Sequence, residues 1–369
     1  MDVLSAANTK AAAGQDVIHM EVGEPCSGPP GRVLEAAKRT LGHRPLGYTE
    51  ALGRPALRRA IADHYQGQYG LEVDAGQIAV TVGASGAFIL GFLAAFDPGD
   101  RVIVPEPAYP AYRNILNALG IEVVRIGLGP ETAFKPTMAD LERIEGPIHG
   151  LVIASPSNPT GTMLDEGELR SLAQFCERRG IRLISDEIYH GITYGPEART
   201  VLEYAPDAII INGFSKYFCM TGWRLGWAVL PEDLIRPVEV LAQNLFISPP
   251  SISQEAALTA FDCRAELDLR LNTYKKSRNA LLDRLSHSRS IEFAPADGAF
   301  YLYADVRHLT DNSTSFCARL LDETGIALAP GADFDKVAGH HYVRLAFCGP
   351  HDRMVKGAER LARWFERQA

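Results

Sequence analysis

Residues 148–186 read IHGLVIASPSNPTGTMLDEGELRSLAQFCERRGIRLISD. The stretch opens with an apolar run of strand length and closes with a second one at residues 181–185. Between them, apolar residues recur at the spacing of one helical face, behind Asp165 and Glu168 and ahead of Gly180, which stands where a helix C′ glycine would. Strand, helix and strand at this spacing predict a βαβ crossover, and therefore a largely parallel sheet that is covered on both faces.

The same alternation continues outward from this unit in both directions. Further strand-like runs lie at residues 78–82, 101–105, 121–126, 207–211 and 225–230. After Pro231 the pattern changes to a helical region at 253–286, short strands near 299–304 and 342–347, and a final amphipathic helix. We therefore expect an α/β fold with a large domain at 43–245, a smaller α+β domain at 246–369, and an N-terminal segment, 1–42, that packs on the small domain.

Composition narrows the classes of function. The chain has 369 residues, of which 46% are hydrophobic and 22% charged, and its net charge of −8 argues against a nucleic-acid-binding surface. Its apolar runs are too short for a membrane span, and no signal peptide is recognisable at the start. The six cysteines are scattered without a CxxC pair, so we expect no disulfide, no metal site and a cytoplasmic protein.

Open parallel sheets bind ligands at the carboxyl ends of their strands, and three polar features fall there. Residues 83–86 (Gly-Ala-Ser-Gly) join a strand to a helix and could bind a phosphate through main-chain N–H groups. Asp186 ends one strand, and Asn158-Pro159 follows another, where the peptide bond before the proline could be cis. Taken singly, each feature is also typical of a tight corner, a helix N-cap or a surface turn.

Lys216 is the fourth feature, and the only lysine between Lys135 and Lys275. It follows a buried strand and lies among aromatic and small residues, where desolvation and the nearby Arg224 would lower the pKa of its amine. An amine tuned in this way captures carbonyl groups. The alternative is a surface lysine whose stem alone is buried.

Together these motifs resemble those of the class I/II aminotransferases, which belong to the fold-type-I enzymes that use pyridoxal 5′-phosphate (PLP). The matching motifs are SNPTG at 157–161, DEIY at 186–189, SK at 215–216 and TGWR at 221–224, and the likeness extends from residue 21 to residue 345. The resemblance implies a PLP-dependent transferase of fold type I, whose large domain holds a mostly parallel seven-stranded sheet flanked by helices, with a smaller α+β domain beside it. It also implies a homodimer.

The resemblance assigns catalytic roles to three residues of this chain. Lys216 would hold PLP as a Schiff base and transfer the proton of the substrate, and Asp186 would pair with the pyridine nitrogen. Tyr189, with Asn158, would hydrogen-bond the phenolic oxygen of the ring. Tyr109 would stack on the ring face.

The remaining assignments concern the phosphate and the substrate. Ala84, Ser85 and Arg224 would bind the phosphate, with Ser215 also among the cofactor-binding residues and Tyr48 reaching in from the neighbouring subunit. The substrate would be bound by the groups Gly23, Asn158 and Arg344, of which Arg344 would grip the α-carboxylate.

Two positions depart from the family pattern. Gly213 stands where many relatives place a hydroxyl residue, so one phosphate contact would be missing. Residues 243–248 contain no arginine, although the aspartate enzymes use an arginine in this neighbourhood for the second substrate carboxylate. Strict aspartate specificity through that device is therefore not expected.

Three functions follow from these observations. The favoured one is transamination, in which an amino group moves between an α-amino acid and an α-keto acid. The second is another PLP reaction on the same scaffold, such as C–S β-elimination or aminocyclopropane formation. The third, an effector-binding part of a transcription regulator, is disfavoured by the acidic charge and by the roughly forty residues that precede the core pattern.

Overall fold

The computed structural model describes residues 2–43, 45–286 and 291–368. Within this part of the chain, a seven-stranded sheet has the order β2-β8-β7-β6-β5-β3-β4. Its strands are β2 (Ile78–Val82), β3 (Arg101–Glu106), β4 (Glu122–Gly127), β5 (Gly150–Ala154), β6 (Arg182–Asp186), β7 (Ile209–Gly213) and β8 (Leu225–Val229). Strands β3 to β7 pair in parallel, whereas β8 runs antiparallel to both β7 and β2. The expected mostly parallel sheet is confirmed.

The βαβ unit forms where the sequence predicts it. Strands β5 and β6 pair in parallel, with Leu151 opposite Leu183, and helix α7 (Glu166–Arg179) connects them. Asp165 and Glu168 form a capping box at the start of this helix, and Gly180 ends it in the left-handed conformation with a φ of 65°.

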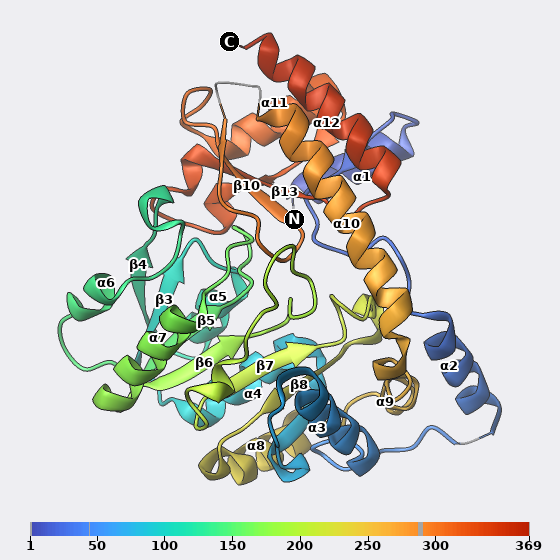
Figure 1. Cartoon of the computed structure of the whole chain (residues 1–369), viewed down its shortest axis with the longest axis vertical. Helices are drawn as coiled ribbons and strands as arrows, with labels where there is room; N and C mark the ends of the chain where they lie inside the picture. Colours follow the sequence, from blue (N-terminus) through green and yellow to red (C-terminus); the bar gives the residue numbers. More distant parts are fainter. Residues whose placement is uncertain (1, 44, 287–290, 369) are drawn as a thin grey trace.

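Helices cover both faces of the large sheet because its strands are apolar on both sides. Leu151 and Ile153 face one core with α7 and α3 (Pro55–Tyr69), whereas Val152 faces a second core. The second core includes α4 (Gly83–Ala95), α5 (Ala111–Ala118) and α8 (Glu232–Leu245). Strands and helices therefore form three layers, with the short helix α6 (Met138–Glu142) at the edge (Figure 1).

A smaller antiparallel sheet forms the second part of the molecule. Its order is β12-β13-β10-β9, and its strands are β9 (Glu292–Phe293), β10 (Tyr301–Asp305), β12 (Ala329–Pro330) and β13 (Tyr342–Ala346). Helices α10 (Arg264–Leu285), α11 (Ser313–Thr324) and α12 (His351–Glu366) pack on it around a core of its own. In Figure 1 this part lies above the seven-stranded sheet, and the long helix α10 runs along the side of both.

The N-terminal residues contact both parts. Helix α1 (Asp2–Ala12) packs on α11, and β1 (Ile18–His19) pairs with β11 (Ile326–Ala327). Helix α2 (Gly31–His43) packs instead on α9 (Ser251–Ala257), and its Val33 lies in the core beneath the large sheet. The expected helical region at 253–286 is divided into α9 and α10, and the domain boundaries at residues 43 and 246 stay a prediction.

Two features of the described residues bear on function. None of the helices there combines the length and apolar character that a membrane crossing requires. The described residues also contain no group of three or more His, Cys, Asp or Glu side chains arranged to hold a metal ion.

Candidate active site

A cavity of about 970 Å³ lies between the strand ends of the large sheet and the small sheet. All but one of the site residues expected from the sequence line it. These are Gly23, Ala84, Ser85, Tyr109, Asn158, Asp186, Tyr189, Ser215, Lys216, Arg224 and Arg344. The exception is Tyr48, whose side chain is 81% exposed on the surface.

Lys216 reaches this cavity from the segment that follows β7. Its Nζ donates a hydrogen bond to the main-chain oxygen of Gly23 at 2.8 Å, and it lies 6.0 Å from the centre of the Phe300 ring. Burial lowers the pKa of the Lys216 amine, and the positive charge of Arg344 lowers it further, whereas Glu24 and Asp186 raise it. The amine is therefore more easily deprotonated than that of a surface lysine.

Asp186 is buried at the end of β6 and accepts two hydrogen bonds. The hydroxyl of Tyr112 donates to Oδ2, and the main-chain N–H of Ile188 donates to Oδ1 at 3.1 Å. Burial raises the pKa of Asp186 to about 6, although both hydrogen bonds and the charge of Lys216 oppose the rise. The site thus holds a carboxyl group that titrates near neutral pH.

Glu187, the next residue, anchors the segment that carries Asp186. Its Oε1 accepts hydrogen bonds from Ser185 at 3.2 Å, Thr200 at 3.0 Å and the N–H of Val201 at 2.9 Å. Burial raises the pKa of Glu187 to about 8 despite these donors. The network fixes the main chain directly behind the Asp186 carboxyl.

Tyr189 and Tyr301 join the two parts of the molecule across the cavity. Their hydroxyls lie 2.7 Å apart, and a Cβ atom added to Gly23 would stand 1.8 Å from the Tyr301 hydroxyl oxygen. Only glycine therefore lets the segment that carries the Gly23 carbonyl approach Tyr301 so closely.

Arg344 lies on β13 of the small sheet and points into the cavity. Its Nη1 donates to Asn158 Oδ1 at 2.8 Å and its Nη2 to the main-chain oxygen of Glu21 at 2.5 Å. The guanidinium carbon lies 4.3 Å from the centre of the Tyr301 ring and 4.6 Å from that of Phe334. Its Nε is buried and has no hydrogen-bond partner among the described residues.

The opposite end of the cavity contains Arg224 and the N-terminus of α4. Arg224 adopts a left-handed conformation, with a φ of 50°, and a Cβ atom on Gly83 would lie 2.4 Å from its Nη2. The guanidinium of Arg224, the N-terminus of α4 and Ser85 therefore lie close together, as an anion-binding site requires. At Gly213, where many relatives place a hydroxyl residue, a Cβ atom would lie 3.1 Å from the Gly226 Cα on β8, so a side chain there would be crowded.

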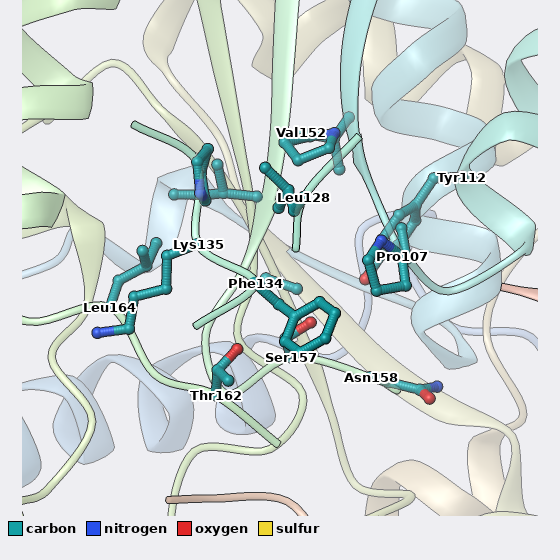
Figure 2. Close-up of a pocket in the computed structure, with 15 residues that line it drawn as sticks. Pro107, Tyr112, Leu128, Phe134, Lys135, Val152, Ser157, Asn158, Thr162 and Leu164 are labelled. Carbon is teal, nitrogen blue, oxygen red and sulfur yellow. The ribbon is translucent and has the colours of Figure 1, made fainter. Parts of the chain in front are cut away.

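A second, much smaller cavity of about 40 Å³ lies behind Asn158. Figure 2 shows the Phe134 ring beside Ser157, with Asn158 at the edge and Tyr112 across the cavity. Its volume suffices for a few water molecules but for no substrate.

The peptide bond between Asn158 and Pro159, which the sequence suggested could be cis, is cis in the structure.

Sequence reasoning missed two residues of this site, Tyr112 and Phe334. The available signal for Tyr112 was its closeness in sequence to Tyr109; Tyr109 precedes α5, which begins at Ala111, and the two ring centres lie 5.6 Å apart. Phe334 follows a turn between β12 and β13, where no motif marks it.

The comparisons with known proteins agree with this geometry. A model of the family "Aminotransferase class I and II" matches residues 15–361, and the chain belongs to this family. The valine–pyruvate aminotransferase of Mycobacterium tuberculosis is 45% identical, over 100% of this chain and 96% of its own.

Solved structures show the same relationship. A crystal structure of an aminotransferase from M. tuberculosis has a TM-score of 0.97 and 45% identity, covering 100% of this chain and 96% of its own. The structure of the aspartate aminotransferase of Thermus thermophilus with maleate has a TM-score of 0.93 and 33% identity, and the match covers 98% of this chain and 95% of that chain. The protein is therefore an aminotransferase, as the resemblance implied, and nothing in these comparisons favours the lyase alternative.

Proposed function

We propose that this aminotransferase uses PLP, held covalently through Lys216, to exchange the amino group of a monocarboxylic amino acid with an α-keto acid. The observation that carries the proposal is the meeting of Lys216, Asp186, Arg224 and Arg344 in one cavity. When bound, PLP supplies an aldehyde that combines with amines and a ring that accepts electrons from the substrate carbon.

The donor set suits that cofactor. The amine of Lys216 stands in the cavity, and burial lowers its pKa, which favours the neutral form that can bond to an aldehyde. Asp186 offers a buried carboxyl for the ring nitrogen, and Asn158 and Tyr189 offer polar groups for the phenolic oxygen. Arg224 and Ser85 offer donors for the phosphate, while Tyr109 offers a ring for stacking.

The proton transfers follow from the same residues. Once the substrate amine has taken the place of Lys216 on the aldehyde, the freed Nζ would accept the proton that leaves the substrate Cα and would donate it back later in the reaction. Burial lowers the pKa of this amine and so favours the neutral form that can accept a proton. Asp186, whose pKa is about 6 in the ligand-free protein, would place its carboxylate charge opposite the ring nitrogen.

Arg344 provides the site for the substrate α-carboxylate. Its unpartnered Nε, together with the Nη2 that now binds Glu21, forms an edge that a carboxylate can engage bidentately. Among the described residues of the cavity wall, Lys216 and Arg224 would be taken up by the cofactor, and the remaining basic side chains besides Arg344, those of Arg113 and Lys336, already bind main-chain carbonyls. A second substrate carboxylate therefore has no free cation.

The rest of the wall favours a small apolar side chain. Leu4, Val22 and Ala329 line it together with the Tyr301 ring. The substrates in the name of the M. tuberculosis relative, valine and pyruvate, have this character. Valine as donor and pyruvate as acceptor, with alanine as the product, are the substrates that the site supports best.

The proposed unit is a homodimer in which Tyr48 reaches the phosphate of the partner subunit. Leu46, Tyr48, Leu245 and Ile247 are all exposed, and the N–H of Thr49 donates to Ser248 Oγ at 3.3 Å, so the two segments lie side by side. Such an exposed apolar surface suits an interface with a second copy of this chain.

A Tyr48→Phe variant should bind PLP about tenfold more weakly, because it loses one hydrogen bond to the phosphate. A protein that is monomeric in analytical ultracentrifugation would contradict the assignment of Tyr48. The expected cytoplasmic location belongs to this proposal too.

A donor-by-acceptor panel tests the function. Purified protein with added PLP is mixed with valine, alanine, aspartate or glutamate and with pyruvate or 2-oxoglutarate, and each new amino acid and keto acid is quantified. Transamination between valine and pyruvate, with aspartate at least about tenfold slower because its second carboxylate finds no cation, supports the proposal. Release of pyruvate, ammonia and a thiol from a thioether amino acid without any keto acid would favour the lyase alternative.

A further inference from the structure

A buried arginine joins the two parts of the molecule at the rim of the active-site cavity. Arg113, on α5, is 5% exposed, and its Nη1 donates to the main-chain oxygen of Phe334 at 3.2 Å. Its Nη2 donates to the main-chain oxygen of Asp333. The N–H of Ala108 also donates to the Phe334 oxygen, at 3.1 Å. Groups next to the large sheet thus hold the turn that follows β12 of the small sheet.

Glu106, at the end of β3, provides the counter-charge. It is 1% exposed, and its Oε1 lies 3.5 Å from Arg113 Nη1. Its Oε2 accepts the main-chain N–H of Lys336 at 3.3 Å, so the segment 333–336 is held at both ends. A buried charge of this kind is costly unless it is paired, and here both ions are paired and hydrogen-bonded to the same segment.

The segment held in this way carries an aromatic ring against the substrate-binding arginine. The ring of Phe334 is buried, and its centre lies 4.6 Å from the Arg344 guanidinium carbon. The other ring on Arg344, Tyr301, belongs to β10, which the sheet itself fixes. Phe334 lies outside any strand, and its main chain is held by the hydrogen bonds that its oxygen accepts and by its own N–H, which donates to the Gly331 oxygen at 2.8 Å.

We infer that Arg113 is a positioning residue for carboxylate recognition, because it fixes the Phe334 ring that orients Arg344. The inference rests on the proposed role of Arg344 as the site of the substrate α-carboxylate. Arg113 acts through the main chain of Asp333 and Phe334 and through the ring, and needs no contact with substrate. Its loss should therefore weaken ligands that carry a carboxylate and spare those that carry none.

Two lysine variants test this inference with matched chemistry. Arg113→Lys keeps a positive charge near Glu106 but loses the fork that binds two carbonyls. Arg125→Lys is the control, because Arg125 is about half exposed and its Nε lies 3.8 Å from the same Glu106 oxygen, whereas the hydrogen bonds to the oxygens of Asp333 and Phe334 come from Arg113. Phe334→Leu is a second variant that removes the ring and keeps the main-chain carbonyl.

The measurements are made on the PLP-loaded enzyme. The Kd of 3-methylbutanoate, a carboxylate without an amino group, is obtained by calorimetry, and KM and kcat are obtained for valine. In Arg113→Lys and Phe334→Leu we expect the Kd and KM to rise about tenfold with kcat changed less than about threefold. Arg125→Lys should match the wild type. The half-reaction with 2-methylpropan-1-amine, which lacks a carboxylate, should keep its rate in all variants.

The outcomes separate this inference from the proposed function. If Arg344→Lys weakens 3-methylbutanoate and Arg113→Lys does not, Arg344 keeps its role and the inference is overturned. If Arg344→Lys leaves the Kd unchanged, the proposed carboxylate site itself is wrong. Equal slowing of the carboxylate-free amine in Arg113→Lys would mean a general structural defect and would also overturn the inference. Should Arg113→Lys not fold, Phe334→Leu decides between these outcomes.

Discussion

Replacing Asp186 by asparagine should make the apoprotein more stable at neutral pH while it destroys activity. Burial raises the pKa of Asp186 from 3.8 to about 6, so the native protein holds this proton more tightly than the unfolded chain does. The stability that the carboxyl contributes is therefore present below about pH 4 and is lost as the pH rises through 6.

The size of the effect follows from that shift. A difference of roughly two pKa units means that an uncharged group at position 186 would raise the free energy of unfolding by about 3 kcal/mol at pH 8, relative to the carboxylate. At pH 5 the wild-type carboxyl is already mostly protonated in the native state, so the advantage of the amide narrows to about half. The amide oxygen can still accept the hydrogen bond from Tyr112 or from the N–H of Ile188.

The assay compares thermal unfolding of the two apoproteins at pH 5 and pH 8. Asp186→Asn should raise Tm at pH 8 by several degrees and at pH 5 by less, while kcat of the PLP-loaded variant falls by at least about 10²-fold because the charge opposite the ring nitrogen is gone. Asp311→Asn, at an exposed bend, is the charge-matched control and should change neither quantity. A variant that is less stable than wild type at pH 8, or equally stabilised at both pH values, refutes the reasoning.

Three further substitutions test other parts of the site. Lys216→Ala should abolish transamination and leave Tm within a few degrees of wild type; retained turnover would show that another group is the nucleophile. Tyr112→Phe removes a hydrogen bond that lowers the pKa of Asp186, so the acidic limb of the kcat/KM profile should move about one unit towards higher pH, and an unchanged profile would contradict this. Gly23→Ala forces a methyl group against the Tyr301 hydroxyl, which should cost about 1–3 kcal/mol of stability; an unchanged Tm would mean that the segment moves freely.

Local sequence patterns predicted the fold because they encode local structure. The βαβ unit at 148–186 was evident from apolar periodicity, a capping box and Gly180, all of which the structure contains. The positions of Asn158, Asp186 and Lys216 followed from the rule that parallel strands end at one edge of a sheet, and all three line one cavity.

Contacts between distant segments were not predictable in this way. The hydroxyl of Tyr112 and the carboxyl of Asp186 are 74 residues apart in sequence, and only the strand order brings them together. Phe334 meets Arg344 because a turn folds back beside β13, and no composition signal marks that approach. The glycine at 213 was noticed as a departure, but its cause, the close approach of Gly226, lies on the neighbouring strand. Tyr48 stays a prediction because its proposed partner belongs to another subunit.

The covalent attachment of PLP to Lys216 is the central claim, and it can be measured directly. The protein is loaded with PLP, reduced with borohydride to fix the cofactor to its lysine, digested, and mapped by mass spectrometry. We expect one modified peptide, with the added mass on Lys216 and none on Lys336, the other lysine of the cavity wall. Modification of Lys336 alone, or no modification at all, would contradict the account.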